Sequence, residues 1–474
     1  MIPNILLSQK FRENINKVFL IVENEEVSQL PLSNVEVDFV LEQLSNKETF
    51  IHINRFSHHV MVVKMDAEKE VSWQLENARR AGDRVVGVLQ QYKQEEVELK
   101  GEDAVLLTAL TEGLALGNYQ YLKYKSEPKE SSLRTIWLDN AEISEEMVEA
   151  LKMQIEGVYV CRDLVNEPVT DLTAPELANR ATQLCEEAGI DVEVFSKQKI
   201  ESLKMGGLLA VNRGSIDPPV FIVMEWKPEN ATNEKPVVLV GKGVVFDTGG
   251  MNLKTVPGSI DHMKSDMGGA ATVISTIYSV AKAKLPVHLV ALVPATDNRV
   301  TGNAYVPGDI IEMFDGTKVE VLNTDAEGRM ILADGLSYAK KYSPELVINV
   351  ATLTGAAAYS IGSKALVGMG NASAEVMNSL KQSGMDTFER VAEMPFWEDY
   401  GELIKSEIAD IKNLGGREAG AITAGKFLEH FTDYPFIHLD IAGPAYIERR
   451  DGYRTAGGTG VGVRLLFNFL NKHK

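Results

Sequence analysis

The chain has 474 residues, of which 45% are hydrophobic and 24% charged, values typical of a folded globular protein with two or more domains. Its formal net charge of −19 argues against nucleic acid as a main partner, because phosphate binding requires a basic face. The two cysteines, Cys161 and Cys185, exclude a disulfide framework, and no apolar run approaches the ~20 residues that span a membrane.

The N-terminal third alternates short apolar runs with helical patterns. Its opening stretch holds too few apolar residues, interrupted by Pro3, to be a signal peptide, so we expect a cytoplasmic protein. The patterns predict strands at residues 50–53, 60–63 and 85–89 and helices at residues 73–81 and 104–117. Residues 1–143 are therefore predicted to form an α/β domain, which carries no dense cluster of catalytic residue types.

A long helical pattern opens at Ser144 and ends before Pro168, and we expect a connecting helix over residues 144–167. Beyond it, in residues 168–474, strands alternate with helices, the strands at 220–224, 237–240, 288–293, 346–350 and 436–441 and the helices at 175–188, 270–283 and 329–342. Such alternation predicts a mostly parallel central sheet flanked by helices, and hence a chain of two α/β domains. Active sites in such sheets lie at the carboxyl ends of the strands.

The first polar cluster of this second domain interrupts a run that should be core. Lys242 and Asp247 lie in the otherwise apolar stretch around residues 240–247, and Lys254 and Asp266 follow it. Taken singly, Lys242 and Asp247 are compatible with a buried ion pair, and Asp266, at the start of a helix, with a helix cap.

The second polar cluster is Asn-Thr-Asp-Ala-Glu-Gly-Arg at residues 323–329. It places Asp325, Glu327 and Arg329 at the start of a helix, where acidic residues are ordinary. Carboxylates at the ends of core strands are costly to bury unless a cation compensates them. Four such carboxylates without a nearby histidine favour Mg²⁺, Mn²⁺ or Zn²⁺, and shared carboxylates favour two ions about 3.5–4 Å apart, as in hydrolytic sites.

The lysines fit this interpretation in two different ways. One of them would be a metal ligand only as a neutral amine, with a pKa lowered by several units beside two dications. The other lysine and Arg329 would stay charged and stabilise an oxyanion.

These motifs resemble those of the leucyl aminopeptidases of the cytosolic, two-metal, hexameric kind. The resemblance covers roughly residues 160–470 and rests on the segments at 241–243, 246–250, 266–270, 323–329, 351–355, 415–418, 438–443 and 458–461. Two departures are visible: Met330 stands where the family usually has Leu, and the interval from Lys254 to Asp266 is one residue longer than usual. The N-terminal domain matches no motif of the family, although its α/β pattern agrees with it.

The resemblance implies an aminopeptidase that removes N-terminal amino acids from peptides, preferably Leu and other apolar residues, and that assembles as a homohexamer. Two divalent ions, Mn²⁺ or Zn²⁺, would be held at one site by Lys242, Asp247, Asp266 and Glu327, and at the other by Asp247, Asp325 and Glu327. Lys254 would polarise the scissile carbonyl, and Arg329 would anchor a bicarbonate ion that acts as general base. The substrate pocket would be lined by Met263, Asn323, Thr352, Leu353, Gly355, Ala442 and Ala445. Relatives commonly carry Met at the last of these positions, which implies a wider pocket here.

Two other functions stay open at this point. A two-metal phosphoesterase would use the same carboxylates but needs more cationic phosphate clamps than Lys254 and Arg329. A non-enzymatic, oligomeric binding protein would have lost some ligand positions, whereas every one here holds a competent residue.

Other signals are weaker. Residues 420–426 have the spacing of a nucleotide-binding loop, but a phenylalanine follows where Ser or Thr is required, so we do not expect nucleotide binding. His58 and His59 on an alternating strand are expected to face opposite ways, and His438 is expected to be a satisfied core residue. Residues 297–299 follow a core strand and border either the site or a subunit contact, between which the sequence does not decide.

Overall fold

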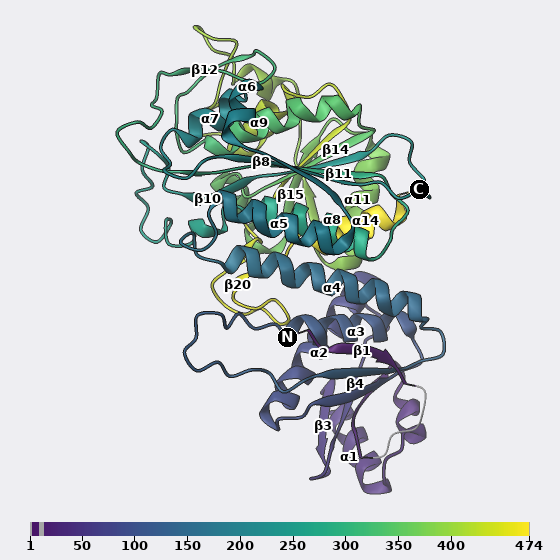
Figure 1. The fold of residues 1–474 in the computed structure, drawn as a ribbon. Coiled ribbons are helices and arrows are strands. Elements are labelled where there is room, and N and C mark those ends of the chain that lie inside the picture. Colours follow the sequence, from purple (N-terminus) through teal and green to yellow (C-terminus); the bar gives the residue numbers. More distant parts are fainter. Residues whose placement is uncertain (1, 9–13, 474) are drawn as a thin grey trace. The chain divides into compact units, whose positions relative to one another are not determined.

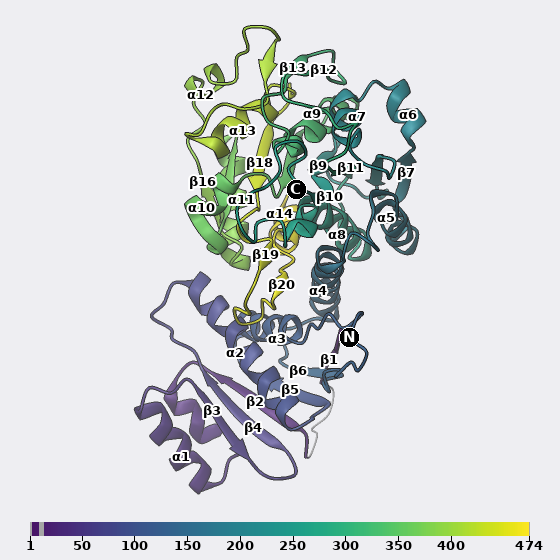
Figure 2. The same cartoon turned by 90° about the vertical axis from the view of Figure 1, so that its left-hand side faces the viewer.

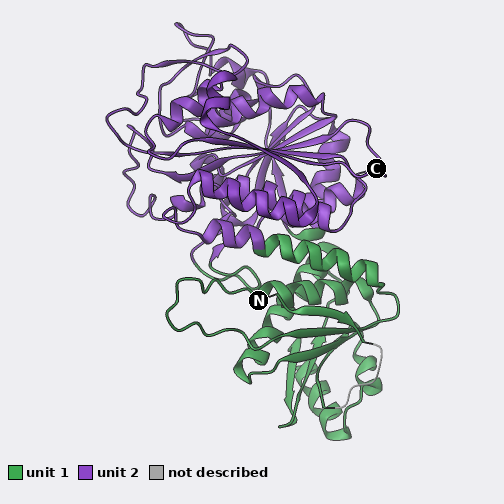
Figure 3. Ribbon diagram, in the orientation of Figure 1, with its two compact units in different colours: residues 1–159, 386–388, 449–456 green, residues 160–385, 389–448, 457–474 purple. Residues whose placement is uncertain are grey.

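The computed structural model describes residues 2–8 and 14–473, and the chain divides into two compact units (Figure 3). The first comprises residues 1–159, 386–388 and 449–456, and the second the remaining 160–385, 389–448 and 457–474. The division falls inside helix α4 (Glu145–Asn166), the helix that the sequence predicts as a connection. Two short segments of the C-terminal half belong to the first unit, which no local sequence pattern indicates.

The first unit is built on a six-stranded sheet in the order β1-β6-β5-β2-β4-β3, parallel except for β3, which is antiparallel to β4. Helices α2 and α3 pack together on one face, and α1 covers the other (Figure 2). The elements are β1 (Asn4–Leu7), β2 (Asn16–Ile21), α1 (Asn34–Ser45), β3 (Phe50–Asn54), β4 (His59–Lys64), α2 (Val71–Gln91), β5 (Glu96–Lys100), α3 (Ala104–Gly117) and β6 (Thr135–Asp139).

One predicted strand of this unit is wrong. Residues 85–89 form part of the C-terminal half of α2 rather than a strand. Val85, Val86 and Leu89 are buried together with Ala78 and Gly82, a spacing that fits one face of a helix. A short apolar run cannot be assigned to helix or strand by its composition alone, and here the packing of α2 against α3 decides for helix.

The second unit is built on a nine-stranded sheet whose central strands, β18, β14, β9 and β11, are mutually parallel. The sheet continues on one side through β15 and β16 and on the other through β8 and β7, and β10 pairs with β11 in parallel. Its strands are β7 (Asp191–Phe195), β8 (Val220–Trp226), β9 (Val237–Gly241), β10 (Gly243–Asp247), β11 (Leu289–Asn298), β14 (Leu346–Ala351), β15 (Leu366–Gly370), β16 (Val391–Glu393) and β18 (Phe436–Asp440).

Helices cover both faces of this sheet, with α5, α8 and α14 on one side and α7, α9 and α13 on the other (Figure 1). The helices are α5 (Ala174–Ala188), α6 (Lys197–Ser202), α7 (Gly206–Asn212), α8 (Gly268–Lys282), α9 (Glu327–Ala339), α10 (Gly355–Ile361), α11 (Ala374–Thr387), α12 (Asp399–Glu402), α13 (Gly420–Glu429) and α14 (Val463–Lys472). Smaller strands are β12 (Ile310–Glu312), β13 (Lys318–Glu320), β17 (Ile411–Lys412), β19 (Tyr446–Ile447) and β20 (Gly457–Gly458). The predicted fold class, two α/β domains with a mostly parallel sheet in the second, is confirmed. None of the helices in the described ranges is long and apolar enough to cross a membrane.

The carboxyl ends of the parallel strands bring the polar motifs together at one edge of the second sheet. Lys242 follows β9 directly, and Asp247 ends β10. Helix α8 starts close against these strand ends, because a Cβ atom at Gly269 would collide with the Val350 carbonyl and lie 2.9 Å from Lys242 N. A side chain at this position would push α8 away from the edge that holds the polar groups.

Candidate active site

Three carboxylates from separate parts of the chain converge at this edge. One carboxylate oxygen from each of Asp247, Asp325 and Glu327 lies within 4.8 Å of the other two. Asp247 ends β10, Asp325 lies in the loop before α9, and Glu327 is the first residue of α9. Asp247 and Glu327 are only 2% and 1% exposed, so the cluster is an internal concentration of negative charge.

Each of two lysines lies between a pair of carboxylates. Lys242 Nζ is 2.8 Å from Asp266 Oδ1 and 2.9 Å from Glu327 Oε1, and it also donates to the Thr352 carbonyl at 2.9 Å. Lys254 Nζ is 2.7 Å from Asp247 Oδ2 and 2.6 Å from Asp325 Oδ1. All five predicted metal ligands and the predicted catalytic lysine therefore meet in one cluster.

The electrostatics of the cluster follow from four carboxylates facing two ammonium groups. Burial, and next the negative charge of Asp247, raise the pKa of Glu327 to about 8, and burial raises the pKa of Asp266 to about 6. Burial opposes the charge of both lysines, but the surrounding carboxylates outweigh it and raise the pKa of Lys242 and of Lys254. The site is short of positive charge, so a cation that enters it is stabilised.

Two oxygens of the cluster test whether metal ions fit. Asp266 Oδ2 and Glu327 Oε2 are buried and accept no hydrogen bond from any described residue. Buried polar atoms of native proteins nearly always have a partner, and an ion is one such partner. Carboxylate oxygens with one amine nitrogen are donors suited to Mg²⁺, Mn²⁺ or Zn²⁺. The residues present therefore fit divalent metal ions.

Arg329 adds a buried guanidinium beside the cluster. Its Nη1 donates to the Asn413 carbonyl at 2.8 Å, whereas its Nε has no partner among the residues that the structure describes. Burial lowers the pKa of Arg329 to about 10, an effect opposed by the charges of Glu327 and Asp440. An unused buried donor on a cation suits a small anion such as the expected bicarbonate.

A cavity of about 580 Å³ opens over the cluster. Its walls include Lys242, Lys254, Arg329 and the four carboxylates, together with six of the seven predicted substrate residues, namely Met263, Asn323, Thr352, Leu353, Gly355 and Ala442. Its size is that of a site for a small ligand. Leu253, Val256 and Tyr359 also line it and are exposed at its rim, and no sequence signal marked them.

Ala445 does not line this cavity but lies one layer behind it. Its Cβ is 3.5 Å from the point that a Cβ at Gly268 would occupy, and Thr352 Cγ2 is 3.1 Å from the same point. Ala445 is 4% exposed. A longer side chain there has to find room beside Gly268 and Thr352, and Thr352 lines the cavity.

Two polar side chains lie behind the site; the sequence left Asn298 between the site and a subunit contact and assigned Asp440 no role of its own. Asn298, at the end of β11, donates to Asp247 Oδ1 at 2.8 Å, which places it at the site rather than at a subunit contact. Asp440, at the end of β18, accepts from Leu353 N and Ala442 N, both at 3.1 Å, and so ties two pocket loops together. The available signal was the same for both: each polar residue ends an apolar strand.

The weaker sequence signals are accounted for by local structure. Lys426 of the 420–426 segment is buried in α13 and paired with Glu429 at 2.8 Å, and His59 is buried whereas His58 is partly exposed. His438 is a core residue as expected but is only half satisfied. Its Nδ1 lies 2.6 Å from Asn349 Oδ1, while its Nε2 has no partner in the described part of the chain.

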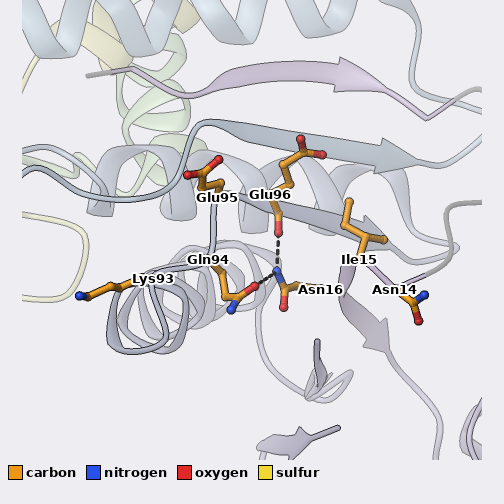
Figure 4. Close-up of a pocket in the computed structure, with 7 residues that line it drawn as sticks. All are labelled: Asn14, Ile15, Asn16, Lys93, Gln94, Glu95 and Glu96. Carbon is orange, nitrogen blue, oxygen red and sulfur yellow. Dashed lines mark hydrogen bonds between the residues drawn. The ribbon is translucent and has the colours of Figure 1, made fainter. Parts of the chain in front are cut away.

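A second hollow of about 580 Å³, in the first unit, is drawn in Figure 4. It is lined by Asn14, Ile15, Asn16, Lys93, Gln94, Glu95 and Glu96. The one buried amide in it, Asn16, is already engaged, because its Nδ2 donates to Gln94 Oε1 and the Glu96 carbonyl and its Oδ1 accepts from His59 N. Among the described residues that line it, this hollow therefore offers no buried polar side chain that lacks a hydrogen-bond partner and is available to a ligand.

Comparison with known proteins supports the chemistry of the first cavity. Residues 159–467 match the cytosol aminopeptidase family, catalytic domain. A Clostridium perfringens protein named "Probable cytosol aminopeptidase" is 39% identical over 94% of this chain and 95% of its own length. A Chlorobium limicola protein of the same name is 43% identical over 79% of this chain and 76% of its own.

Two solved structures share the fold over nearly the whole chain. The bottromycin maturation enzyme BotP in complex with Mn is 28% identical with a TM-score of 0.85, covering 97% of this chain and 99% of that one. A mutant of tomato leucine aminopeptidase is 24% identical with a TM-score of 0.87, covering 99% of this chain and 96% of that one. At that identity the tomato enzyme supports the fold alone.

Gly328, within the 323–329 segment, lies directly against the side chain of Lys242. A Cβ atom at Gly328 would lie 2.7 Å from Lys242 Nζ and closer still to Lys242 Cε. The lysine therefore crosses the start of α9 where only a hydrogen atom leaves room for it.

Gly328→Ala is expected to displace the Lys242 ammonium while leaving α9 intact, because a side chain rather than backbone must give way. A misplacement of about 1 Å costs ~10²-fold in catalysis, so we expect at least that loss in kcat/KM for release of an N-terminal amino acid. Gly335→Ala on the same helix is the control, since the atoms nearest to its Cβ would be side-chain atoms of Val240 and Pro294, none closer than 3.2 Å. Wild-type kcat/KM in Gly328→Ala would contradict the role predicted for Lys242.

Proposed function

The chain belongs to the cytosol aminopeptidase family of metal-dependent exopeptidases, and we propose that the cluster around Glu327 is its active site. The observation that carries this proposal is the convergence of three carboxylates, two of them buried and one half-buried, within 4.8 Å of one another on a cavity lined by two lysines and an arginine. Membership of the family sets aside the non-enzymatic function and favours peptides over phosphate esters as substrates.

Two divalent ions, Mn²⁺ or Zn²⁺, are proposed to bind in this cluster. Lys242, Asp247, Asp266 and Glu327 would hold one, and Asp247, Asp325 and Glu327 the other. When bound, such ions polarise a carbonyl group and lower the pKa of a water molecule. The buried oxygens of Asp266 and Glu327 that accept no hydrogen bond from described residues support this assignment, and a structurally similar enzyme, BotP, is known in complex with Mn.

The two lysines are given different tasks. Lys242 would act as a neutral ligand, which requires the charge of the ions themselves, because the carboxylates alone raise its pKa. Lys254 keeps its charge, is 15% exposed and lines the cavity, so it can donate to the scissile carbonyl oxygen as negative charge develops there. Arg329 is proposed to hold a bicarbonate ion, whose chemistry when bound is that of a general base.

Substrate preference follows from the apolar part of the cavity. Met263, Leu353 and Ala442 offer apolar contact, which favours the burial of Leu and Met side chains at about 25 cal/mol per Å². Asp and Glu side chains would approach the carboxylate cluster and are disfavoured. We therefore propose peptides with an apolar N-terminal residue as substrates.

Removal of divalent metal by chelation is expected to abolish the release of Leu from a Leu-peptide, and Mn²⁺ or Zn²⁺ to restore it. Glu327→Gln should lose bound metal and turnover together, whereas Lys254→Ala should keep the metal and lose ~10²–10³-fold in kcat. Glu312→Gln, an exposed acid in the same unit, is the control. Full activity after chelation, with the metal content measured, would overturn the metal assignment.

A cytoplasmic homohexamer is proposed as the working form, as the family resemblance implies. Exposed apolar side chains beside the site, Met251 at 47% and Leu253 at 52%, support burial against further copies of the chain. Light scattering at micromolar concentration should give the mass of six chains. A monomer that is both stable and active would refute this assembly.

Ala445→Met is expected to narrow the substrate pocket, because the longer side chain has to find room beside Gly268 and Thr352, and Thr352 lines the pocket. The kcat/KM for an N-terminal Phe should fall about 10-fold relative to Leu, within the range that pocket contacts of this size decide. The measurement compares Leu, Met, Phe, Ala and Glu substrates in wild type and variant. An unchanged ratio of Phe to Leu would show that this position does not shape the pocket.

A further inference from the structure

A buried amide and a buried phenol lie directly behind the proposed metal ligands. Asn298 is 1% exposed, and its Nδ2 donates both to Asp247 Oδ1 at 2.8 Å and to the Thr324 carbonyl at 3.0 Å. Tyr305 is 1% exposed, and its hydroxyl donates to the same carbonyl at 2.9 Å. One amide group thus touches two chain segments that carry proposed ligands.

The first of these contacts fixes which oxygen Asp247 presents. Its Oδ1 accepts from Asn298 Nδ2 and from Gly249 N, both at 2.8 Å, and these two donors fill the ordinary capacity of one carboxylate oxygen. Its Oδ2 is left to face the cluster, where it contacts Lys254 at 2.7 Å. Rotation of the carboxylate would break both hydrogen bonds, so Asp247 is held in one orientation.

The second contact fixes the peptide that leads into Asp325. The Thr324 carbonyl accepts from Asn298 and from Tyr305, while Thr324 N donates to Asn252 Oδ1 at 2.9 Å. The Thr324 hydroxyl donates to the Gly249 carbonyl at 2.8 Å. The carbonyl, N–H and hydroxyl of Thr324 are therefore all hydrogen-bonded. These bonds hold the orientation of the peptide that connects Thr324 to Asp325.

Strand pairing brings the amide to this place. Asn298 is the register partner of Asp247 in the parallel β10–β11 pair, after an irregularity that follows Val244. The turn after β10 then passes so near that a Cβ at Gly250, where φ is +63°, would lie 2.8 Å from Asn298 Oδ1. The backbone at Gly250 therefore packs directly against the Asn298 amide.

We propose that Asn298, together with Tyr305, is a positioning residue that sets the directions in which Asp247 and Asp325 present their carboxylates to a divalent ion. The chemistry of the two groups suits this role, because both donate hydrogen bonds and neither carries charge. A carboxylate at position 298 would add a further negative charge, and an ammonium would compete with the metal for the same oxygens. The proposal rests on the metal site put forward above.

The test measures Mn²⁺ binding to metal-free protein by competition with a chelating dye, alongside the thermal midpoint of the metal-free form. Asn298→Leu keeps the shape and removes the donor, and Tyr305→Phe removes one hydroxyl. Asn212→Leu is the matched control, since this buried amide donates to the Asp217 carbonyl and Thr296 Oγ1 and touches no proposed ligand. Loss of such an outer partner typically weakens metal binding ~10–100-fold.

We expect Asn298→Leu to bind Mn²⁺ ~10–100-fold more weakly and Tyr305→Phe to be weakened in the same direction by less. Asn212→Leu should bind Mn²⁺ as wild type does, even where its thermal midpoint falls as far as that of Asn298→Leu. Wild-type affinity in Asn298→Leu would overturn the proposal, and if that variant does not fold, wild-type affinity in Tyr305→Phe overturns it. Failure of the metal site itself appears differently, as a wild-type protein that binds no Mn²⁺.

Discussion

Four carboxylates share one buried edge of a sheet, and the need to balance their charge organises the rest of the second unit. An unpaired buried carboxylate is so costly that it protonates or recruits a cation. Here Lys242 and Lys254 each contact two of the four acids at 2.6–2.9 Å. The first residue of α9, Glu327, gains further from the positive end of the helix dipole. The two lysines and the start of α9 therefore act together to balance the negative charge of the four carboxylates.

Close backbone approach makes this arrangement possible. Gly269 lets α8 start against the strand ends, and Gly328 lets Lys242 cross α9. The polar edge rests on a large apolar core beneath it, which includes Val240, Leu292 and Leu336. Burial of this core stabilises the folded state and offsets the repulsion between the carboxylates of the site. Its dense packing also keeps the strand ends in register.

The sequence predicted what depends on local patterns and missed what depends on distant contacts. The strands at 237–240 and 346–350 and the polar cluster at 323–329 were visible because apolar runs and charged residues alternate along the chain. The helical nature of residues 85–89 was missed because only packing against α3 distinguishes it from a strand. The role of Asp440, and the choice for Asn298 between the site and a subunit contact, depend on distant contacts. Asp247, the partner of Asn298, lies 51 residues away along the chain, and Leu353, one partner of Asp440, lies 87 residues away, so no spacing rule connects them.

The buried polar residues behind the site differ in whether they donate or accept hydrogen bonds, and this difference follows from the groups that they contact. Behind the anionic ligand Asp247 stands a neutral donor, Asn298, which supports the carboxylate without altering the charge of the cluster. Behind the pocket loops stands an acceptor instead, because Leu353 and Ala442 expose backbone N–H groups that Asp440 collects. Burial raises the pKa of Asp440 to about 6 although these hydrogen bonds favour its charged form. An acid placed behind the ligands would add to their repulsion, and an amide in place of Asp440 could not serve all its donors with the same oxygens. The residue at each strand end thus matches the group that it holds: an amide that donates to a carboxylate, and a carboxylate that accepts from N–H groups. This explains why Asn298 and Asp440, both buried at the ends of strands, are different residue types.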